Sequence, residues 1–317
     1  MIRLIIVRRT ALRPTYTVYL AHGSAHSCFA PGNGAFADQQ KPCYCLSRKL
    51  KSFPDNFLPE IQMTYCLAIN TETGFILCSD SRTNAGFDNV SSYSKMHTFV
   101  WPNNRVFALL SSGNLATTQL VIKRLQADLD SDATPSLFNV KNMHEAVDYV
   151  AMISTSVQSI HVVRDRGNVN FEATFILAGQ IGHDRPETLM IYPQGNYIHE
   201  SNEHPFLQIG EIKYGKPILD RVINRNTSLD EAGRCALVSM NSTVRSNLTV
   251  APPIELLIYE KDSLSLTHQL CLTENDPFSK ALSEAWNHGL VMALQNLPKF
   301  DWELEKSSAV NSLQSSQ

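Results

Sequence analysis

The chain has 317 residues, of which 43% are apolar and 18% charged, and its formal net charge is −3 at pH 7. This composition predicts a globular protein that can bury a sizeable core, as one large domain or as two ordinary ones. It excludes a membrane-spanning helix, because no window approaches the roughly 18 consecutive apolar residues that such a helix needs. Seven scattered cysteines, an odd number without the paired spacing of a disulfide framework, indicate reduced thiols and a cytoplasmic location.

Residues 1–62 differ from the rest of the chain in charge and in pattern. They carry eight Lys or Arg and three acidic residues, for a net charge of +5, whereas the remainder carries −8. They show little hydrophobic periodicity and are rich in Gly, Ala, Ser and Pro, which is typical of loops. We predict that they are an extension outside the folded domain, from a start assigned too early or, as a second interpretation, a removable leader. The acidic remainder gives no reason to expect nucleic acid as a partner.

An ordered pattern begins at Met63. The segments TYCLAIN and GFILCSD are rich in β-branched, aromatic and apolar residues, and the polar stretch between them ends in Gly74, so a β-hairpin is predicted. Centring the turn on Glu72 places Thr64 opposite Asp80. A hydroxyl at the start of one strand is then expected within a few ångströms of a carboxylate at the end of its partner.

Further strands and helices follow in blocks. The expected strands are 97–101, 105–110, 171–181, 189–192 and 254–260. The expected helices are one from Leu115 with Asn114 as its N-cap, and those over 143–160, 215–222, 229–245 and 277–297. This order predicts an α+β fold in which helices cover antiparallel sheets. The domain is expected to span residues 63–305, and the Ser- and Gln-rich residues 306–317 are expected to form a flexible tail.

Four motifs, in this order, carry a resemblance to a known family. They are Thr64 followed by SDSRTNAG, then Lys95, then SSGNLATTQ, and finally IGEIKYGKP at 209–217. From residue 63 to about 260 the chain resembles the β-subunits of proteasome-type peptidases of the N-terminal nucleophile superfamily, and among these the bacterial proteasome-related proteins called Anbu. The resemblance implies an αββα four-layer sandwich and assembly into rings or open helical rings.

The resemblance also implies that Thr64 is the nucleophile, provided that it is the first residue of the mature chain. Its hydroxyl needs a base, and a free α-amine with an unperturbed pKa near ~8 can serve, whereas a nitrogen bound in the Met63–Thr64 amide cannot. Lys95 is then expected beside Thr64, where it lowers the pKa of that amine, with Asp80 holding the lysine. Gly113 is expected to offer its backbone N–H to the oxyanion.

Arg82 and Asn84 are expected to support this site, the backbone of Asn84 by pairing with an extended peptide as an added strand. The spacing from Gly86 to Lys95 is shorter than in a proteasome subunit. The placement of Lys95 beside Thr64 therefore depends on a local bulge or a shortened loop. Glu211 lies in the segment that replaces a Ser-Gly element of proteasomes.

A second departure from the proteasome pattern concerns an acid that supports the amine. Asn241 stands where this acid is expected, and a neutral amide cannot supply the same charge. Ser242 and Ser246 are left as candidate helpers, and weak or narrow activity is expected.

Each of these residues also has an ordinary structural interpretation. A threonine beside an aspartate is commonly an edge pair, Lys95 could be a solvated surface lysine, and Asp80 could satisfy a turn. Gly113 could serve only a helix-entry loop.

The combined prediction is a threonine-type endopeptidase that hydrolyses peptide bonds of peptides or unfolded proteins inside a self-compartmentalising homo-oligomer. No cofactor and no metal are expected, because Cys43-x-Cys45 lacks a second pair and because His199 and His204 are interpreted as loop residues in preference to weak metal ligands. No membrane partner is expected, and an ATPase partner is left open. Two alternatives remain, namely a small-molecule amidase of the same superfamily and an inactive ring or scaffold, for which Asn241 is the best support.

Overall fold

The computed structural model describes residues 64–84, 90–164, 169–266 and 268–303. The predicted extension 1–62 and the predicted tail 306–317 lie outside these residues. The described residues all belong to one compact unit within Leu58–Gln317. None of the helices in this part of the chain is both long enough and apolar enough to cross a membrane.

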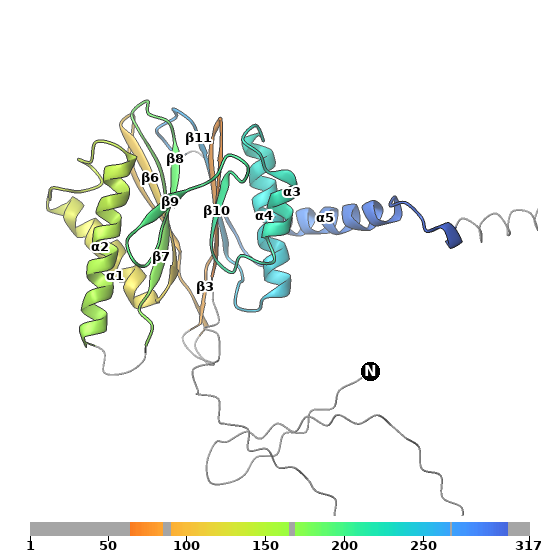
Figure 1. Ribbon diagram of the computed structural model, residues 1–317, viewed down its shortest axis with the longest axis horizontal. Helices are drawn as coiled ribbons and strands as arrows, with labels where there is room; N and C mark the ends of the chain where they lie inside the picture. Colours follow the sequence, from red (N-terminus) through yellow and green to blue (C-terminus); the bar gives the residue numbers. More distant parts are fainter. Residues whose placement is uncertain (1–63, 85–89, 165–168, 267, 304–317) are drawn as a thin grey trace, which may run out of the picture. The chain divides into compact units, whose positions relative to one another are not determined.

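Strands and helices come in blocks, as Figure 1 shows. The described strands are β1 (Tyr65–Thr71), β2 (Gly74–Asp80), β3 (Arg82–Asn84), β4 (Val90–Ser92), β5 (Met96–Trp101), β6 (Arg105–Gly113), β7 (Ala173–Ile181), β8 (Glu187–Ile191), β9 (Tyr197–His199), β10 (Phe206–Gly210), β11 (Ile254–Glu260) and β12 (His268–Leu272). The described helices are α1 (Leu115–Asp130), α2 (Met143–Arg164), α3 (Lys216–Val222), α4 (Leu229–Ser246) and α5 (Pro277–Gln295). Every predicted strand and helix is present.

Two antiparallel sheets of five strands form the centre of the fold. Their strand orders are β10-β1-β2-β11-β12 and β5-β6-β7-β8-β9, and β3 pairs with β4 in a separate ribbon. The prediction of an α+β fold with antiparallel sheets is confirmed at this level. Five strands were not predicted, namely β3, β4, β9, β10 and β12, of which three have only three residues and β12 is largely exposed.

The first hairpin is confirmed, but its predicted register is wrong by one residue. Thr71 pairs with Gly74, so the turn holds two residues, Glu72 and Thr73, instead of being centred on Glu72. Continuing this register brings Tyr65, not Thr64, opposite Asp80. A loop with an even number of residues shifts all pairs by one, which is why the predicted Thr64–Asp80 pair does not form.

Strand alternation divides the buried side chains of β1 and β2 between two cores. Tyr65, Leu67 and Ile69 pack with residues of α3 and α4. The intervening Cys66 and Ala68 pack with residues of β6 and β7, so this core lies between the two five-stranded sheets.

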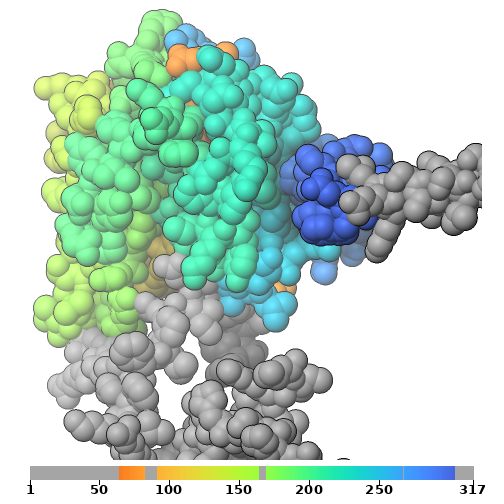
Figure 2. Space-filling view, turned by 45° about the vertical axis from the view of Figure 1, so that its right-hand side comes forward, coloured from red at the N-terminus to blue at the C-terminus, as the bar shows by residue number. Residues whose placement is uncertain are grey.

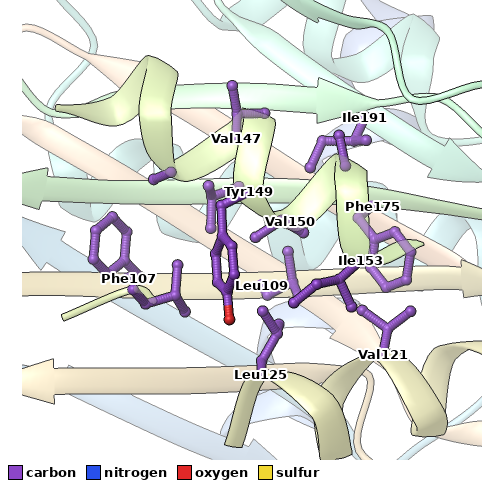
Figure 3. Packing of buried hydrophobic residues seen from close by; sticks show 14 of the residues in the cluster. Phe107, Leu109, Val121, Leu125, Val147, Tyr149, Val150, Ile153, Phe175 and Ile191 are labelled. Carbon is purple, nitrogen blue, oxygen red and sulfur yellow. The ribbon is translucent and has the colours of Figure 1, made fainter. Parts of the chain in front are cut away.

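A third core lies between the β5–β9 sheet and the helices α1 and α2, as Figure 3 shows. Val147, Val150 and Ile153, spaced along one stripe of α2, meet Phe107 of β6 and Phe175 of β7. Helices thus cover the outer face of each sheet, and this packing fixes the strand ends at which the predicted site residues lie.

Helix α5 differs from the others because none of its residues is buried. Asp276 caps its first turn by accepting from the N–H of Ser279, and Asn287 accepts from Arg245 of α4. Figure 2 shows part of the surface of α5 in dark blue. Its exposed apolar residues include Phe278, Leu290, Val291, Met292 and Leu294.

Candidate active site

Asp80 ends β2, and its side chain is fully buried. Its Oδ1 accepts hydrogen bonds from the Lys95 ammonium at 2.7 Å and from the backbone N–H of Tyr65 at 3.0 Å. Its Oδ2 accepts from the N–H of Ala251 at 3.4 Å. Burial raises the pKa of the Asp80 carboxyl, whereas Lys95 and the two backbone donors oppose that rise because they stabilise the carboxylate. The carboxylate thereby links three separate segments of the chain.

Lys95 lies just before β5 and is only 7% exposed. Besides Asp80, its ammonium donates to the backbone carbonyl of Arg82 at 2.7 Å. The carbonyl of Lys95 accepts from the N–H of Ser111 in β6 at 3.0 Å. The Arg82 guanidinium donates in turn to the carbonyl of Leu248 at 2.9 Å. The interpretation of Lys95 as a solvated surface lysine is therefore wrong, and its charge is fixed where screening by water is weak.

Thr64 is buried at the start of β1, one residue before the amide that Asp80 binds. Its carbonyl accepts from the N–H of Glu211 at 2.7 Å. Gly210 makes this approach possible, because its φ of +84° suits glycine and a Cβ there would lie 2.0 Å from the Thr64 carbonyl oxygen. The same Cβ would lie 3.3 Å from Oγ of Ser112, so the end of β6 borders this point as well.

Gly113 is the last residue of β6, next to Ser112. Its φ of +111° and the 2.4 Å that would separate an added Cβ from the Glu172 carbonyl oxygen require a glycine. Asn114 then caps α1 by accepting from the N–H of Thr117, as predicted. Gly113 thus ends a strand directly before the N-cap residue of α1 instead of lying in a helix-entry loop, and a role toward an oxyanion stays a prediction.

Glu211 joins Thr64 to the end of α4. Its Oε1 accepts from the N–H of Lys213, and its Oε2 accepts from the side-chain amide of Asn247 at 3.1 Å. Asn247 is the C-cap residue of α4 and also accepts from Thr249 through its Oδ1. Sequence reasoning missed Asn247, although an asparagine just after a periodic helix is a recognisable C-cap signal.

The other candidate residues on α4 form no hydrogen bond with Thr64, Asp80 or Lys95 within the part of the chain that the structure describes. Asn241 accepts from the Ser283 hydroxyl of α5 at 3.4 Å and lines a small cavity with Leu237 and Leu282. Ser242 is half-buried on the same helix, and Ser246 is exposed at its end. The predicted position of Asn241 as a neighbour of the Thr64 amine therefore does not match its contacts.

A buried hydroxyl pair supports β1 from the helix side instead. The Tyr65 and Ser239 hydroxyls lie 2.7 Å apart, and the Tyr65 oxygen accepts from the side-chain amide of Gln208 at 2.7 Å. Burial raises the pKa of the Tyr65 phenol, so this group stays neutral. Gly215 leaves the space, since a Cβ there would lie 2.2 Å from the Ser239 oxygen. No motif in the sequence indicated this pair.

Asn84 lies in β3, where its backbone pairs with Val90 of β4. The residues between these two strands, including Gly86 of the predicted short spacing, lie outside the described chain. Pairing of the Asn84 backbone with a peptide stays a prediction.

Hydrogen bonds join Lys95 to Asp80 and to Arg82, and another joins Glu211 to Thr64. The two groups meet at Tyr65, which follows Thr64 in the chain and donates its N–H to Asp80. The arrangement sets a buried ammonium and a buried carboxylate at the first residue of a strand. Such a pair can shift the pKa of a neighbouring amine and hold the backbone of that residue in place.

No family model matches the chain, and no curated protein matches it. Solved structures of Anbu proteins do match. The helical assembly of the Anbu complex from Pseudomonas aeruginosa has 43% identity and a TM-score of 0.72, over 75% of this chain and 98% of that one. Anbu, an ancestral β-subunit, from Yersinia bercovieri has 41% identity and a TM-score of 0.71, over 75% of this chain and 99% of that one. An Anbu Gly-1 mutant from Hyphomicrobium sp. strain MC1 has 40% identity and a TM-score of 0.70, with the same coverage.

Proposed function

The chain belongs to the Anbu family of proteasome-related proteins, and on that premise we propose that it is a threonine-type peptidase with Thr64 as its nucleophile. The observation that carries this proposal is the buried Asp80–Lys95 ion pair, whose carboxylate also binds the amide directly after Thr64. An edge pair or a turn aspartate would not need a buried ammonium as its partner. The proposed fold is an αββα four-layer sandwich, supported by one core between the sheets and one on each outer sheet face.

The proposed reaction begins when the Thr64 hydroxyl attacks the carbonyl carbon of a peptide bond. The free α-amine of the same residue takes the hydroxyl proton, and Lys95 favours the unprotonated amine by its charge. The backbone N–H of Gly113 stabilises the oxyanion. The C–N bond then breaks, the leaving amine takes up the proton, and an ester on Thr64 remains. Water hydrolyses this ester and restores the hydroxyl.

This chemistry requires that the bond between Met63 and Thr64 is absent in the active form. Either translation begins at Met63 and an aminopeptidase removes it, or a leader is cleaved before Thr64. The 2.7 Å hydrogen bond from the Glu211 N–H to the Thr64 carbonyl supports the proposal, because it fixes the backbone of the proposed nucleophile.

The test compares three proteins on fluorogenic peptides: the full chain, a chain that begins at Thr64, and the same shortened chain with Thr64→Ala. We expect hydrolysis only by the chain that begins at Thr64. Equal rates for this chain and its Thr64→Ala variant would overturn the proposal. Circular dichroism on all three proteins controls for folding.

We further propose that the chain assembles with copies of itself into a ring or an open helical ring that encloses peptide or unfolded-protein substrates. The solved Anbu complex from Pseudomonas aeruginosa is a helical assembly. In this chain, support comes from the exposed apolar residues of α5 and from a cavity of about 560 Å³ that Trp286 of α5 lines together with Ile218 and Val238. Head-to-tail contacts of one subunit type give rings or spirals according to the rotation between copies. Analytical ultracentrifugation tests this proposal, with a monomer at all concentrations as the contradicting result.

The scaffold alternative is based on Asn241, a neutral amide where an acid is expected. Asn241 contacts Ser283 of α5, so its identity does not act on Thr64 through a direct contact. The small-molecule amidase predicts a narrow closed pocket and activity on short amides alone. Measuring hydrolysis of peptides of increasing length separates it from a peptidase.

A further inference from the structure

We propose that His144, Glu187 and His199 form a binding site for Zn²⁺ at the sheet edge under the start of α2. One ligand atom from each of the three side chains lies within 4.8 Å of the other two. This site departs from the expectation that the protein has no metal, and from the interpretation of His199 as a loop residue, because His199 ends the strand β9.

The three residues converge for reasons of topology. Leu189 pairs with His199 across β8 and β9, and Glu187 precedes Leu189 by two residues, so all three side chains belong to one face of the sheet. Leu189 belongs to the core shared with α2, which identifies this face as the one that α2 covers. His144 is the second residue of α2, where the helix begins over that edge (Figure 1).

The distances suit a tetrahedrally coordinated ion. Nδ1 of His199 and Oε2 of Glu187 are 3.6 Å apart, too far for a hydrogen bond but close to the roughly 3.3 Å between two ligands that each lie about 2.0 Å from zinc. The ligand atom of His144 lies within 4.8 Å of the other two ligand atoms. To reach the ligand-to-ligand separation of a zinc site, this atom has to move by about 1.5 Å at most. Exposed rings such as that of His144 can make this movement by side-chain rotation.

The chemistry of the donors points to the same class of ion. Two imidazoles and one carboxylate are the ligand set of open zinc sites, in which water fills the fourth position. The Tyr197 hydroxyl lies 3.4 Å from Nδ1 of His144, so this nitrogen can donate to the hydroxyl and leave Nε2 for the metal. The rings of His144 and His199 are already 5.5 Å apart between centroids.

A bound ion would join the start of α2 to the hairpin of β8 and β9. The strand β9 has only three residues and lies at the edge of its sheet, so it gains most from a cross-link. The opposite edge of the same sheet is β5, next to Lys95. The metal is thus expected to stabilise the fold without taking part in hydrolysis at Thr64.

The test measures Zn²⁺ affinity of the metal-free full chain by competition with a chromogenic chelator, together with the thermal midpoint. Cys43 and Cys45 are changed to Ser in every protein, because thiolates could bind zinc as well. We expect one Zn²⁺ per chain, a raised midpoint, and affinity lowered about tenfold or more by His144→Ala or His199→Ala. The absorption spectrum with Co²⁺ substituted for Zn²⁺ should be that of a four-coordinate site.

Two controls keep the inference open to refutation. His204→Ala removes another exposed histidine beside an acidic residue, Asp220, and should leave zinc affinity unchanged. Glu187→Gln preserves the shape of the side chain and should lower affinity while the circular dichroism spectrum stays the same. Equal affinity in the starting protein and in the His144→Ala/His199→Ala double variant would overturn the site, as would an equal loss in His204→Ala.

Discussion

Replacing Asp80 by Asn removes one charge from the buried pair and leaves an oxygen that can still accept from the amide of Tyr65. The Asp80 side chain is fully buried, and Lys95 is only 7% exposed. Breaking a buried ion pair by removing one partner costs about 3–5 kcal/mol, because the other charge stays buried without that partner. We therefore expect Asp80→Asn to lower the free energy of unfolding by about this amount.

The assay is urea unfolding of Asp80→Asn, Lys95→Met and the double variant, at one fixed protomer concentration because assembly also affects stability. The double variant should lose clearly less than the sum of the two single losses, since neither charge then remains buried. Single losses below about 1 kcal/mol, the value typical of exposed pairs, would refute the reasoning. Additive losses would refute it as well.

Three further predictions follow from particular contacts. Gly210→Ala should cost roughly 2 kcal/mol or more in unfolding free energy and abolish hydrolysis, since its Cβ would lie 2.0 Å from the Thr64 carbonyl oxygen; chemical unfolding and peptide assays check this. Asn241→Asp should leave the hydrolysis rate unchanged, whereas Asn247→Ala, which removes the Glu211 contact, should lower it, and the opposite order would contradict the site. Burial lowers the pKa of His97, so the unfolded chain binds that proton more readily. The free energy of unfolding should therefore fall as the pH drops from the pKa of His97 in the unfolded chain, ~6.5, to its lower pKa in the folded chain. His97→Gln should remove part of this fall, which unfolding curves at several pH values measure.

The sequence was sufficient to predict the long elements and the first hairpin, because their hydrophobic periods are strong and Gly74 marks the turn. It was insufficient for the register, since a polar stretch such as Asn70–Gly74 allows more than one turn length and each choice changes the pairs. The short strands β3, β4 and β9 carry too few residues for a period to be visible, and the exposed β12 lacks alternation.

The site was predicted from the resemblance. Geometry explains why the Asp80–Lys95 pair forms as expected and why the expected position of Asn241 is wrong. The Asp80–Lys95 pair forms through side chains at strand ends, so the shift of register did not prevent it. Asn241 could not be placed from a motif, because residues two apart on a helix point in different directions. Ser239 faces Tyr65, and two residues later Asn241 faces α5.

The central claim is that Thr64 reacts through its hydroxyl with its own free amine as the base. It is tested most directly by peptide mapping after treatment with an epoxyketone peptide, which bonds to the hydroxyl and the α-amine of one N-terminal threonine. We predict a single adduct on Thr64 of the chain that begins there, and none on Thr64→Ala or on the full chain. An adduct on another residue, or none on any form of the protein, would contradict this claim.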